Sequence, residues 1–474
     1  MAQEDSSSLL RALPSVDALL RTERVRALRE AVGARHLATL ARNVTEELRE
    51  RLQEGAGKET TASNGNLTRE GLLLEAAQML ERACERERAK GLRRVINASG
   101  VIIHTNLGRA PLSEAARRRV SEEAARYCTL EYDLETGKRG RRGGRVEKLL
   151  AELTGAEDAL VVNNCAAAAL LVLSVLAQGG ETIISRGELV EIGGDFRVPD
   201  VMAQSGTRLV EVGTTNRTRL EDYRRALSGQ TRLLMRVHPS NYRIVGFTAT
   251  PALAELAKLA HDAGLPLYED AGSGALFDLV PYGLEGEAVI CESIASGADV
   301  VSFSGDKLLG AAQAGLIVGR QEVVERLRKH PLYRALRADK LALAALEATL
   351  ESHRRGTAFD EIPALRMLAQ TPTQMLERAS NFLARLQHND SLSLECEIIE
   401  GQSAIGGGSA PTTHPQTTLL ALTHKTLSAD EIENALRRST PPVIARIAVD
   451  KVLLDLRTVF ADEEAELLKA LLSI

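Results

Sequence analysis

Between about residues 95 and 320, short apolar segments alternate with helical or loop segments, and this alternation constrains the fold more than any other feature. The expected strands are VINASGVIIH, DALVV, ETIISR, TRLVEVG, TRLLMRV, LPLYEDAG, ADVVSFSGDK and GLIVG. Strands that alternate with helices form a doubly wound, mostly parallel sheet, because each helix returns the chain to the same edge. The sequence therefore predicts an α/β domain.

Helical segments precede this region, and a mixed segment follows it. Apolar side chains recur at three- and four-residue spacing through residues 1–53, and the polar run Glu54–Asn66 is typical of a loop or hinge. We predict four parts: a helical appendage at 1–65, a linker helix at 66–94, a large catalytic domain at 95–335 and a small α+β domain at 336–474.

The composition is that of an ordinary globular protein, with 44% hydrophobic residues, 26% charged residues and a net charge of −5. No window approaches 18 consecutive apolar residues, and the first 30 residues lack the apolar core of a secretory signal. The five cysteines are scattered, without a Cys-x-x-Cys pair or histidines at metal spacing. We expect a cytoplasmic protein with reduced thiols, no metal site and no membrane partner.

The segment SFSGDKLLG presents Lys307 after a small-residue turn at the end of an apolar strand. In PLYEDAGSG, 37 residues upstream, Asp270 ends a second apolar strand. An amine and a carboxylate at two strand ends suit pyridoxal phosphate, because the lysine can form a Schiff base and the aspartate can pair with the protonated pyridine nitrogen. This order and spacing resemble the fold-type I enzymes that use pyridoxal phosphate.

Further residues could hold the same cofactor. VNNCAAAALL places Asn164, Cys165 and Ala166 where a strand turns into a helix, and free N–H groups there could bind the cofactor phosphate. An ordinary strand-to-helix junction explains this segment equally well. Ser304 could donate a second hydrogen bond to the phosphate or be only a turn residue. His238 is another cofactor-binding candidate that could instead simply pack.

Arginines supply candidate sites for an anionic substrate. HTNLGR places Arg109 in a polar loop after a strand, and PLYRALR places Arg334 and Arg337 on one helical face, where they could bind a phosphate or form surface ion pairs. The basic segment Lys138–Arg145 is typical of a mobile loop, which could contact a polyanion or a neighbouring subunit's active site. Gly406–Pro411, GGGSAP, favours a turn over a phosphate cradle.

Several segments together resemble bacterial selenocysteine synthase, the L-seryl-tRNA(Sec) selenium transferase family. They are NASGVIIHTNLGRAPLS, SNYRIVGF, EDAGSG, SFSGDKLLGAAQAGLIVG and HPLYRALRADK, and the similarity spans about residues 95–460. The resemblance implies an aspartate aminotransferase-like fold, with Lys307 carrying pyridoxal phosphate and Asp270 on its ring nitrogen. It implies conversion of L-seryl-tRNA(Sec) to L-selenocysteyl-tRNA(Sec) through a cofactor-bound aminoacrylate. Arg109, Arg334 and Arg337 would bind the donor, selenophosphate, in a site shared between subunits.

The resemblance further implies a homo-oligomeric ring of dimers, typically a decamer, whose amino-terminal domain binds the tRNA and which has no DNA partner. Candidate tRNA contacts, each equally well explained as a solvated surface residue, are Arg21, Arg24, Arg26, Arg29, Arg42, Arg49 and the Arg139–Arg145 loop. The alternative function is a β-eliminating lyase of the same fold, acting on a free amino acid or amino sugar. The sequence leaves open the role of Asp306, the use of sulfur donors, and what holds the seryl carbonyl, for which Arg446 is one candidate.

Overall fold

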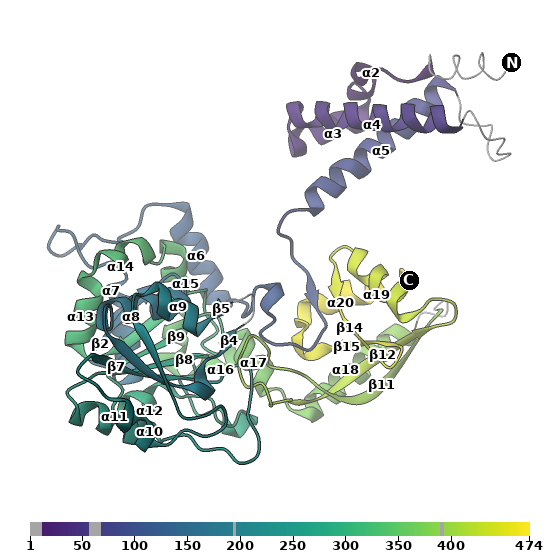
Figure 1. The fold of residues 1–474 in the computed structure, drawn as a ribbon. Coiled ribbons are helices and arrows are strands. Elements are labelled where there is room, and N and C mark those ends of the chain that lie inside the picture. The colour runs from purple at the N-terminus through teal and green to yellow at the C-terminus, as the bar shows by residue number, and fades with distance from the viewer. Residues whose placement is uncertain (1–11, 56–67, 193–195, 389–392) are drawn as a thin grey trace. The chain divides into compact units, whose positions relative to one another are not determined.

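The computed structural model describes residues 12–55, 68–192, 196–388 and 393–474. The chain divides into two compact units, Met1–Arg94 and Val95–Ile474 (Figure 1). The polar run predicted as a loop at Glu54–Asn66 lies outside the described residues, except for its first two positions, which end a helix.

The amino-terminal unit is a small helical bundle. Its helices are α2 (Val16–Leu20), α3 (Glu23–Val32), α4 (Ala34–Gly55) and α5 (Arg69–Ala89). Ser15 and Thr68 cap α2 and α5, because each side-chain oxygen accepts a hydrogen bond from an amide of the first turn. Leucines from α2, α4 and α5 form a common buried core, so α5, in the stretch predicted as a linker helix, packs within the bundle.

The Val95–Ile474 unit is built on a seven-stranded sheet (Figure 1). In sheet order the strands are β2 (Asp158–Val162), β10 (Gly315–Gly319), β9 (Val300–Ser304), β8 (Leu267–Gly272), β7 (Thr231–Val237), β3 (Glu181–Ser185) and β6 (Arg208–Val212). Neighbouring strands from β9 to β6 pair in parallel, and β10 is antiparallel to β9 and β2. The predicted α/β fold with a mostly parallel sheet is confirmed.

Helices cover both faces of this sheet, because consecutive strand residues point to opposite sides. Leu160 and Val162 of β2 join one apolar cluster, whereas Ala159 and Val161 join another. The first cluster includes α8 (Cys165–Leu176), α9 (Val198–Gln204) and α13 (Gln321–Lys329). The opposite face carries α7 (Gly144–Thr154), α10 (Leu220–Ala226), α11 (Leu253–Asp262), α12 (Ile290–Ala295) and α15 (Lys340–Arg355). Because α15 covers the large sheet, the packing of the large domain continues past the boundary predicted near residue 335.

The segment VINASGVIIH does not join the large sheet as a strand. Only β1 (Ile96–Asn97) forms, and it pairs in parallel with β13 (Val443–Ile444). The side chain of Asn97 donates to the carbonyl of Val101 at 3.0 Å and so closes a local turn that ends the strand. Beyond this turn, Val101 pairs with Ala404, so the segment connects to the carboxyl-terminal part of the chain.

The carboxyl-terminal part has its own antiparallel sheet, as the predicted α+β arrangement requires. Its strands, in order, are β11 (Leu394–Gln402), β12 (Gln416–His424), β15 (Lys451–Asp455) and β14 (Arg446–Ala448). Helices α18 (Pro372–Gln387), α19 (Ala429–Arg438) and α20 (Glu464–Leu471) share an apolar core with this sheet. The short helices α16 (Ala358–Glu361) and α17 (Pro363–Ala369) precede this carboxyl-terminal part in the chain.

Arg457 is buried at the junction between the small sheet and the segments around it, with 1% of its surface exposed. Its Nε donates to Ser403 Oγ at 2.9 Å, its Nη1 donates to the carbonyls of Met367 and Gln370 at 2.8 Å each, and its Nη2 donates to the carbonyl of Gln416 at 2.7 Å. A buried guanidinium is tolerated only when its donors are satisfied in this way.

Asp455 supplies the compensating negative charge beside Arg457. Its carboxylate accepts hydrogen bonds from Ser403 Oγ at 2.6 Å and Thr417 Oγ1 at 3.0 Å. Gly100 approaches so closely that a Cβ placed on it would lie 2.3 Å from Asp455 Oδ2. Asp455 therefore holds the segment that contains Gly100 against the small sheet.

No helix among the described residues is long and apolar enough to cross a membrane.

Replacing Arg457 with methionine should destabilise the protein by about 3–5 kcal/mol, because it leaves the buried carbonyls of Met367, Gln370 and Gln416 without their donor and removes the positive charge near the Asp455 carboxylate. Urea unfolding followed by circular dichroism measures this change. The matched control is Arg437→Met on α19, where an exposed ion pair with Glu433 at 2.7 Å should contribute less than about 1 kcal/mol. Equal losses in the two variants would contradict the structural role of Arg457.

Candidate active site

Asp270 and Lys307 lie at the same edge of the large sheet. Asp270 is on β8, Lys307 follows the end of β9, and these two strands pair in parallel. The loop after β9 is closed by a hydrogen bond from the amide of Gly305 to the carbonyl of Ala314 at 2.9 Å. Only 7% of Asp270 and 4% of Lys307 is exposed, so both charged groups are held away from bulk water.

A cavity of about 270 Å³ contains both side chains. It is lined by Arg109, Asn164, Cys165, Ala166, Ile192, Asp270, Gly272, Ser304, Asp306, Lys307, Gln313 and Ala314. The structure therefore brings together most of the site residues proposed from the sequence. Three of them, His238, Arg334 and Arg337, do not line this cavity.

A network of donors orients the carboxylate of Asp270. Its Oδ1 accepts hydrogen bonds from Ser302 Oγ at 3.1 Å and from Cys165 Sγ at 3.5 Å. The hydroxyl of Tyr268 lies 2.7 Å from Ser302 Oγ and extends the network. Burial raises the pKa of Asp270, while the hydrogen bond from Ser302 opposes this change. A buried carboxylate of this kind is stabilised by a cation, which a protonated ring nitrogen would supply.

The amino terminus of α8 forms another wall of the cavity. Asn164 caps the helix, because its Oδ1 accepts a hydrogen bond from the amide of Ala167 at 2.9 Å. The amides of Cys165 and Ala166 lie in the first turn, where a helix offers no carbonyl acceptors. These donors and the helix dipole suit a phosphate group. Gly315 permits this arrangement, since a Cβ placed on it would lie 2.1 Å from the carbonyl oxygen of Asn164.

Two basic side chains, Arg109 and Lys307, and the acidic side chain of Asp306 line the same cavity. Arg109 Nη1 donates to Asp306 Oδ2 at 2.8 Å, and Arg109 adopts a φ of +62°, which is uncommon for a residue other than glycine. Burial lowers the pKa of Lys307, and the charge of Arg109 contributes to the same effect. A lowered pKa favours the free amine, which is the form that attacks an aldehyde.

These groups fit pyridoxal phosphate. Lys307 can attach the aldehyde, Asp270 can pair with the ring nitrogen, and the α8 amino terminus with Ser304 can hold the phosphate. Within the described residues no group of three or more His, Cys, Asp or Glu side chains is arranged to hold a metal ion.

His238 follows β7 at the same sheet edge but faces a different cavity, of about 220 Å³. Its amide donates to the carbonyl of Asp270 at 2.9 Å, and its Nε2 lies 2.8 Å from the carbonyl oxygen of Gly286. The structure thus places the backbone of His238 against Asp270 and its ring away from the Lys307 cavity.

Arg334 and Arg337 belong to α14 (Pro331–Leu336) and the residue that follows it. Arg337 Nη1 donates to Glu131 Oε1 at 3.1 Å, and Arg337 forms an isolated bridge with Val162 at the end of β2. Arg334 is exposed and forms no ion pair within the described parts of the chain. Within this chain, neither side chain lines the cavity that contains Lys307.

A turn from the carboxyl-terminal part of the chain also reaches Lys307. Gly406, Gly407 and Gly408 have φ values of +78°, +64° and +72°. A Cβ placed on Gly408 would lie 3.6 Å from Lys307 Nζ and 3.7 Å from Ile192 Cγ2. The three consecutive glycines predict a turn, but its contact with a lysine far away in the sequence is visible only in the tertiary structure.

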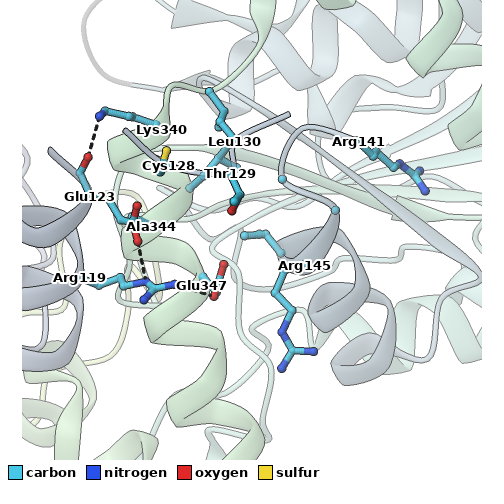
Figure 2. Close-up of a pocket in the computed structure, with 14 residues that line it drawn as sticks. Arg119, Glu123, Cys128, Thr129, Leu130, Arg141, Arg145, Lys340, Ala344 and Glu347 are labelled. Atoms are coloured by element: carbon cyan, nitrogen blue, oxygen red, sulfur yellow. Dashed lines mark hydrogen bonds and ion pairs between the residues drawn. The ribbon is translucent and has the colours of Figure 1, made fainter. Parts of the chain in front are cut away.

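A third pocket, of about 200 Å³, lies between α6 (Glu114–Ala125), the start of α7 and α15 (Figure 2). It is rich in basic side chains, but they are already paired. Lys340 donates to the carbonyl of Glu123 at 2.6 Å, and Arg119 lies 3.5 Å from Glu347 (Figure 2). None of the candidate catalytic or cofactor-binding residues lines this pocket, but Arg141 and Arg145 of the basic loop do.

The neighbouring basic loop is paired in the same way. Arg139 and Arg142 both contact Glu131 at 2.6 Å, and Arg141 contacts Glu147 at 2.7 Å. The arginines of the loop therefore have acidic partners within the chain, which weakens the case that the loop offers free charges to a polyanion.

Residues 95–460 match the family model described as L-seryl-tRNA selenium transferase. The chain is 47% identical to the L-seryl-tRNA(Sec) selenium transferase of Geobacter sulfurreducens, over 97% of this chain and 98% of the relative. It is 48% identical to the enzyme of the same name from Moorella thermoacetica, over 98% of this chain and 97% of the relative.

A solved structure titled D-glucosaminate-6-phosphate ammonia-lyase has a similar fold. It is 21% identical and has a TM-score of 0.57, and the match covers 81% of this chain and 96% of that one. At this identity the likeness concerns the fold alone.

The pH dependence of cofactor attachment tests the electrostatics around Lys307. Attachment of pyridoxal phosphate to the apoprotein, trapped with borohydride and quantified by mass spectrometry, should have its midpoint below 10.5, the ordinary pKa of lysine. Replacing Arg109 with methionine removes a neighbouring cation and leaves Asp306 unpaired, so the pKa of Lys307 and the midpoint should both rise. At a fixed pH below the midpoint, attachment to Arg109→Met should be several-fold slower than attachment to the wild type.

The variant Arg109→Lys retains a cation and is the matched control, which should stay close to the wild type. A midpoint that is unchanged in Arg109→Met would show that Arg109 does not influence Lys307.

Proposed function

Since this chain belongs to the L-seryl-tRNA selenium transferase family, we propose that it converts L-seryl-tRNA(Sec) to L-selenocysteyl-tRNA(Sec) in the cavity that contains Lys307. The observation that carries the proposal is the meeting, in one cavity, of the buried Lys307, the buried Asp270 and the open amino terminus of α8. The relatives that carry this name match nearly the whole chain, including the helical amino-terminal unit.

Pyridoxal phosphate, when bound, withdraws electrons from the Cα of a substrate whose amino group it holds, which acidifies the Cα proton and allows the β-hydroxyl to leave. The residues of the chain position and support this chemistry. Asp270 would keep the ring nitrogen protonated, while the amides of Cys165 and Ala166 and the hydroxyl of Ser304 would hold the phosphate. Lys307, as a free amine, would remove the Cα proton and later return it.

Selenophosphate is the proposed selenium donor, and Arg109, Arg334 and Arg337 are proposed to bind it. Arg109 lines the Lys307 cavity, and Arg334 is exposed without an ionic partner in the described chain. A donor with several negative charges requires such cations. Because Arg334 and Arg337 do not line the cavity of their own subunit, we place them at the site of a neighbouring subunit in a homo-oligomer.

The helical Met1–Arg94 unit is proposed to bind the tRNA. Arg26, Arg29 and Arg42 are exposed and form no ion pairs within the described residues, so their charges are available to phosphates. Arg21 pairs with Asp17 at 2.7 Å, and Arg24 and Arg49 also have acidic partners. The unpaired arginines of α3 and α4 are therefore the favoured contacts.

A conversion assay tests the function. With pyridoxal phosphate and radiolabelled selenophosphate, the protein should label seryl-tRNA(Sec) and leave seryl-tRNA(Ser) unlabelled. Lys307→Ala should lower the rate by at least about 100-fold, because it removes the group that moves the Cα proton. The matched control is Lys329→Ala on α13, an exposed lysine that should not affect the rate. Absence of label on both tRNAs, with the cofactor bound, would favour the small-molecule lyase.

Salt-dependent binding tests the tRNA contacts. Replacing Arg26 and Arg29 together with alanine should weaken tRNA(Sec) binding and reduce the magnitude of the slope of log affinity against log salt by about 2, one for each lost phosphate contact. Arg21→Ala, whose arginine is paired with Asp17, should leave the slope unchanged. An unchanged slope in the double variant would remove these two arginines from the tRNA interface.

A further inference from the structure

The turn Gly406–Ser409, here called the glycine turn, is held firmly at the edge of the Lys307 cavity. A Cβ placed on Gly406 or Gly407 would lie 2.4 Å from Val101 Cγ1 or 2.6 Å from Ile103 Cγ2, respectively. The amide of Ile103 donates to the carbonyl of Ile405 at 2.7 Å, directly before the turn. The turn is therefore a packed part of the site with a defined position.

The glycine turn offers neutral hydrogen-bond donors that the protein itself does not use. Among the described residues, the amides of Gly407 and Gly408 donate to no acceptor. Ser409 is 2% exposed, and its buried Oγ has no hydrogen-bond partner. Buried polar groups without partners are rare in folded proteins and call for a ligand or water. A Cβ placed on Gly408 would lie 3.6 Å from Lys307 Nζ and 3.7 Å from Ile192 Cγ2, so the backbone of Gly408 lies next to two residues that line the cavity.

The cations near the cavity have other partners. Arg109 is paired with Asp306 at 2.8 Å, and Lys307 is the cofactor lysine of the proposed function. Arg446, the residue considered from the sequence for the seryl carbonyl, does not line the cavity, and its Nη2 donates to the carbonyl of Gln402 at 2.8 Å. No other lysine or arginine among the described residues lines this cavity.

This arrangement matches the chemistry of an ester. In an aminoacyl-tRNA the seryl carbonyl is neutral and only accepts hydrogen bonds, whereas free serine carries a carboxylate that loses its hydration in a closed site. A buried carboxylate requires a cation, but a neutral carbonyl is satisfied by N–H and O–H donors.

We propose that the glycine turn binds the carbonyl oxygen of the seryl ester, through the amide of Gly408 and the hydroxyl of Ser409. By doing so it selects esterified serine over free serine. This inference rests on the proposed function and names the substrate group that the turn recognises.

Binding of small analogues to the holoenzyme tests the inference without tRNA or selenium donor. The probes are L-serine methyl ester and L-serine, and their affinities are measured from the change in cofactor absorbance. The wild type should bind the ester at least about 10-fold more tightly than free serine. Ser409→Ala should weaken ester binding about 5-fold, the effect of one hydrogen bond, and change serine binding little. Gly408→Ala should weaken ester binding more, because its methyl group enters the space beside Lys307 Nζ.

The matched control for the glycine variant is Gly264→Ala. Gly264 has a φ of +67°, and no heavy atom lies within 4 Å of the position that an added methyl group would take. The variant therefore measures the effect of placing alanine at a positive φ, away from the cavity and without a steric clash. This control should bind both probes as the wild type does.

Three results would overturn the inference: equal wild-type affinities for ester and free serine, unchanged ester affinity in Ser409→Ala, or a defect in Ser409→Ala confined to the use of selenophosphate. Failure of the proposed function is a separate result, because there the wild type transfers no selenium to seryl-tRNA(Sec) whatever its affinity for the ester. Ser409→Ala retains the glycine backbone, so it tests the inference even if Gly408→Ala fails to fold.

Discussion

The parallel pairing of β8 with β9 is the constraint on which the rest of the site depends. Parallel strands end at the same edge of a sheet, so the register that pairs Asp270 with Ser302 also brings Lys307, just after β9, to the same cavity. The same register places Ser302 Oγ within 3.1 Å of the Asp270 carboxylate. One backbone arrangement therefore positions the carboxylate, its hydrogen-bond donor and the amine together.

Burial then determines what these groups can do. It raises the pKa of Asp270 and lowers the pKa of Lys307, so each group is moved towards its neutral form. A cofactor with a positive ring nitrogen and an aldehyde would relieve both effects, since the nitrogen pairs with the carboxylate and the aldehyde reacts with the free amine. The electrostatic cost of burying the two residues would thus be offset by the chemistry of the cofactor.

A second constraint connects the small sheet to this cavity. Arg457 and Asp455 together hold Ser403, and the chain runs from Ser403 directly into the glycine turn. Gly100 packs against Asp455, and the segment that follows it leads to Arg109 in the cavity wall. These two buried charged residues, bridged by Ser403, therefore support two separate segments that contribute to the site, although neither residue lies in it.

Much of the fold could be predicted from local patterns. The strands carrying Asp270 and Ser304 are short, apolar and followed by small residues, so their type and their shared sheet edge follow from the sequence. The start of α8 near Asn164 was also predicted from the sequence as a strand-to-helix junction, whereas the side-chain cap by Asn164 is seen only in the structure. The exception was VINASGVIIH, whose apolar pattern suggested a strand, whereas the side-chain hydrogen bond of Asn97 ends β1 after two residues.

The sequence by itself determined the α/β class and predicted Lys307, Asp270 and Arg109 as candidate site residues, because these depend on strand periodicity and on which residues follow each strand. Only the tertiary structure decided which distant segments meet. It placed Gly408 beside Lys307, turned the ring of His238 towards a different cavity, and paired Arg337 with Glu131. Such contacts join residues far apart in the chain, and their geometry is set by packing between layers, which no local pattern encodes.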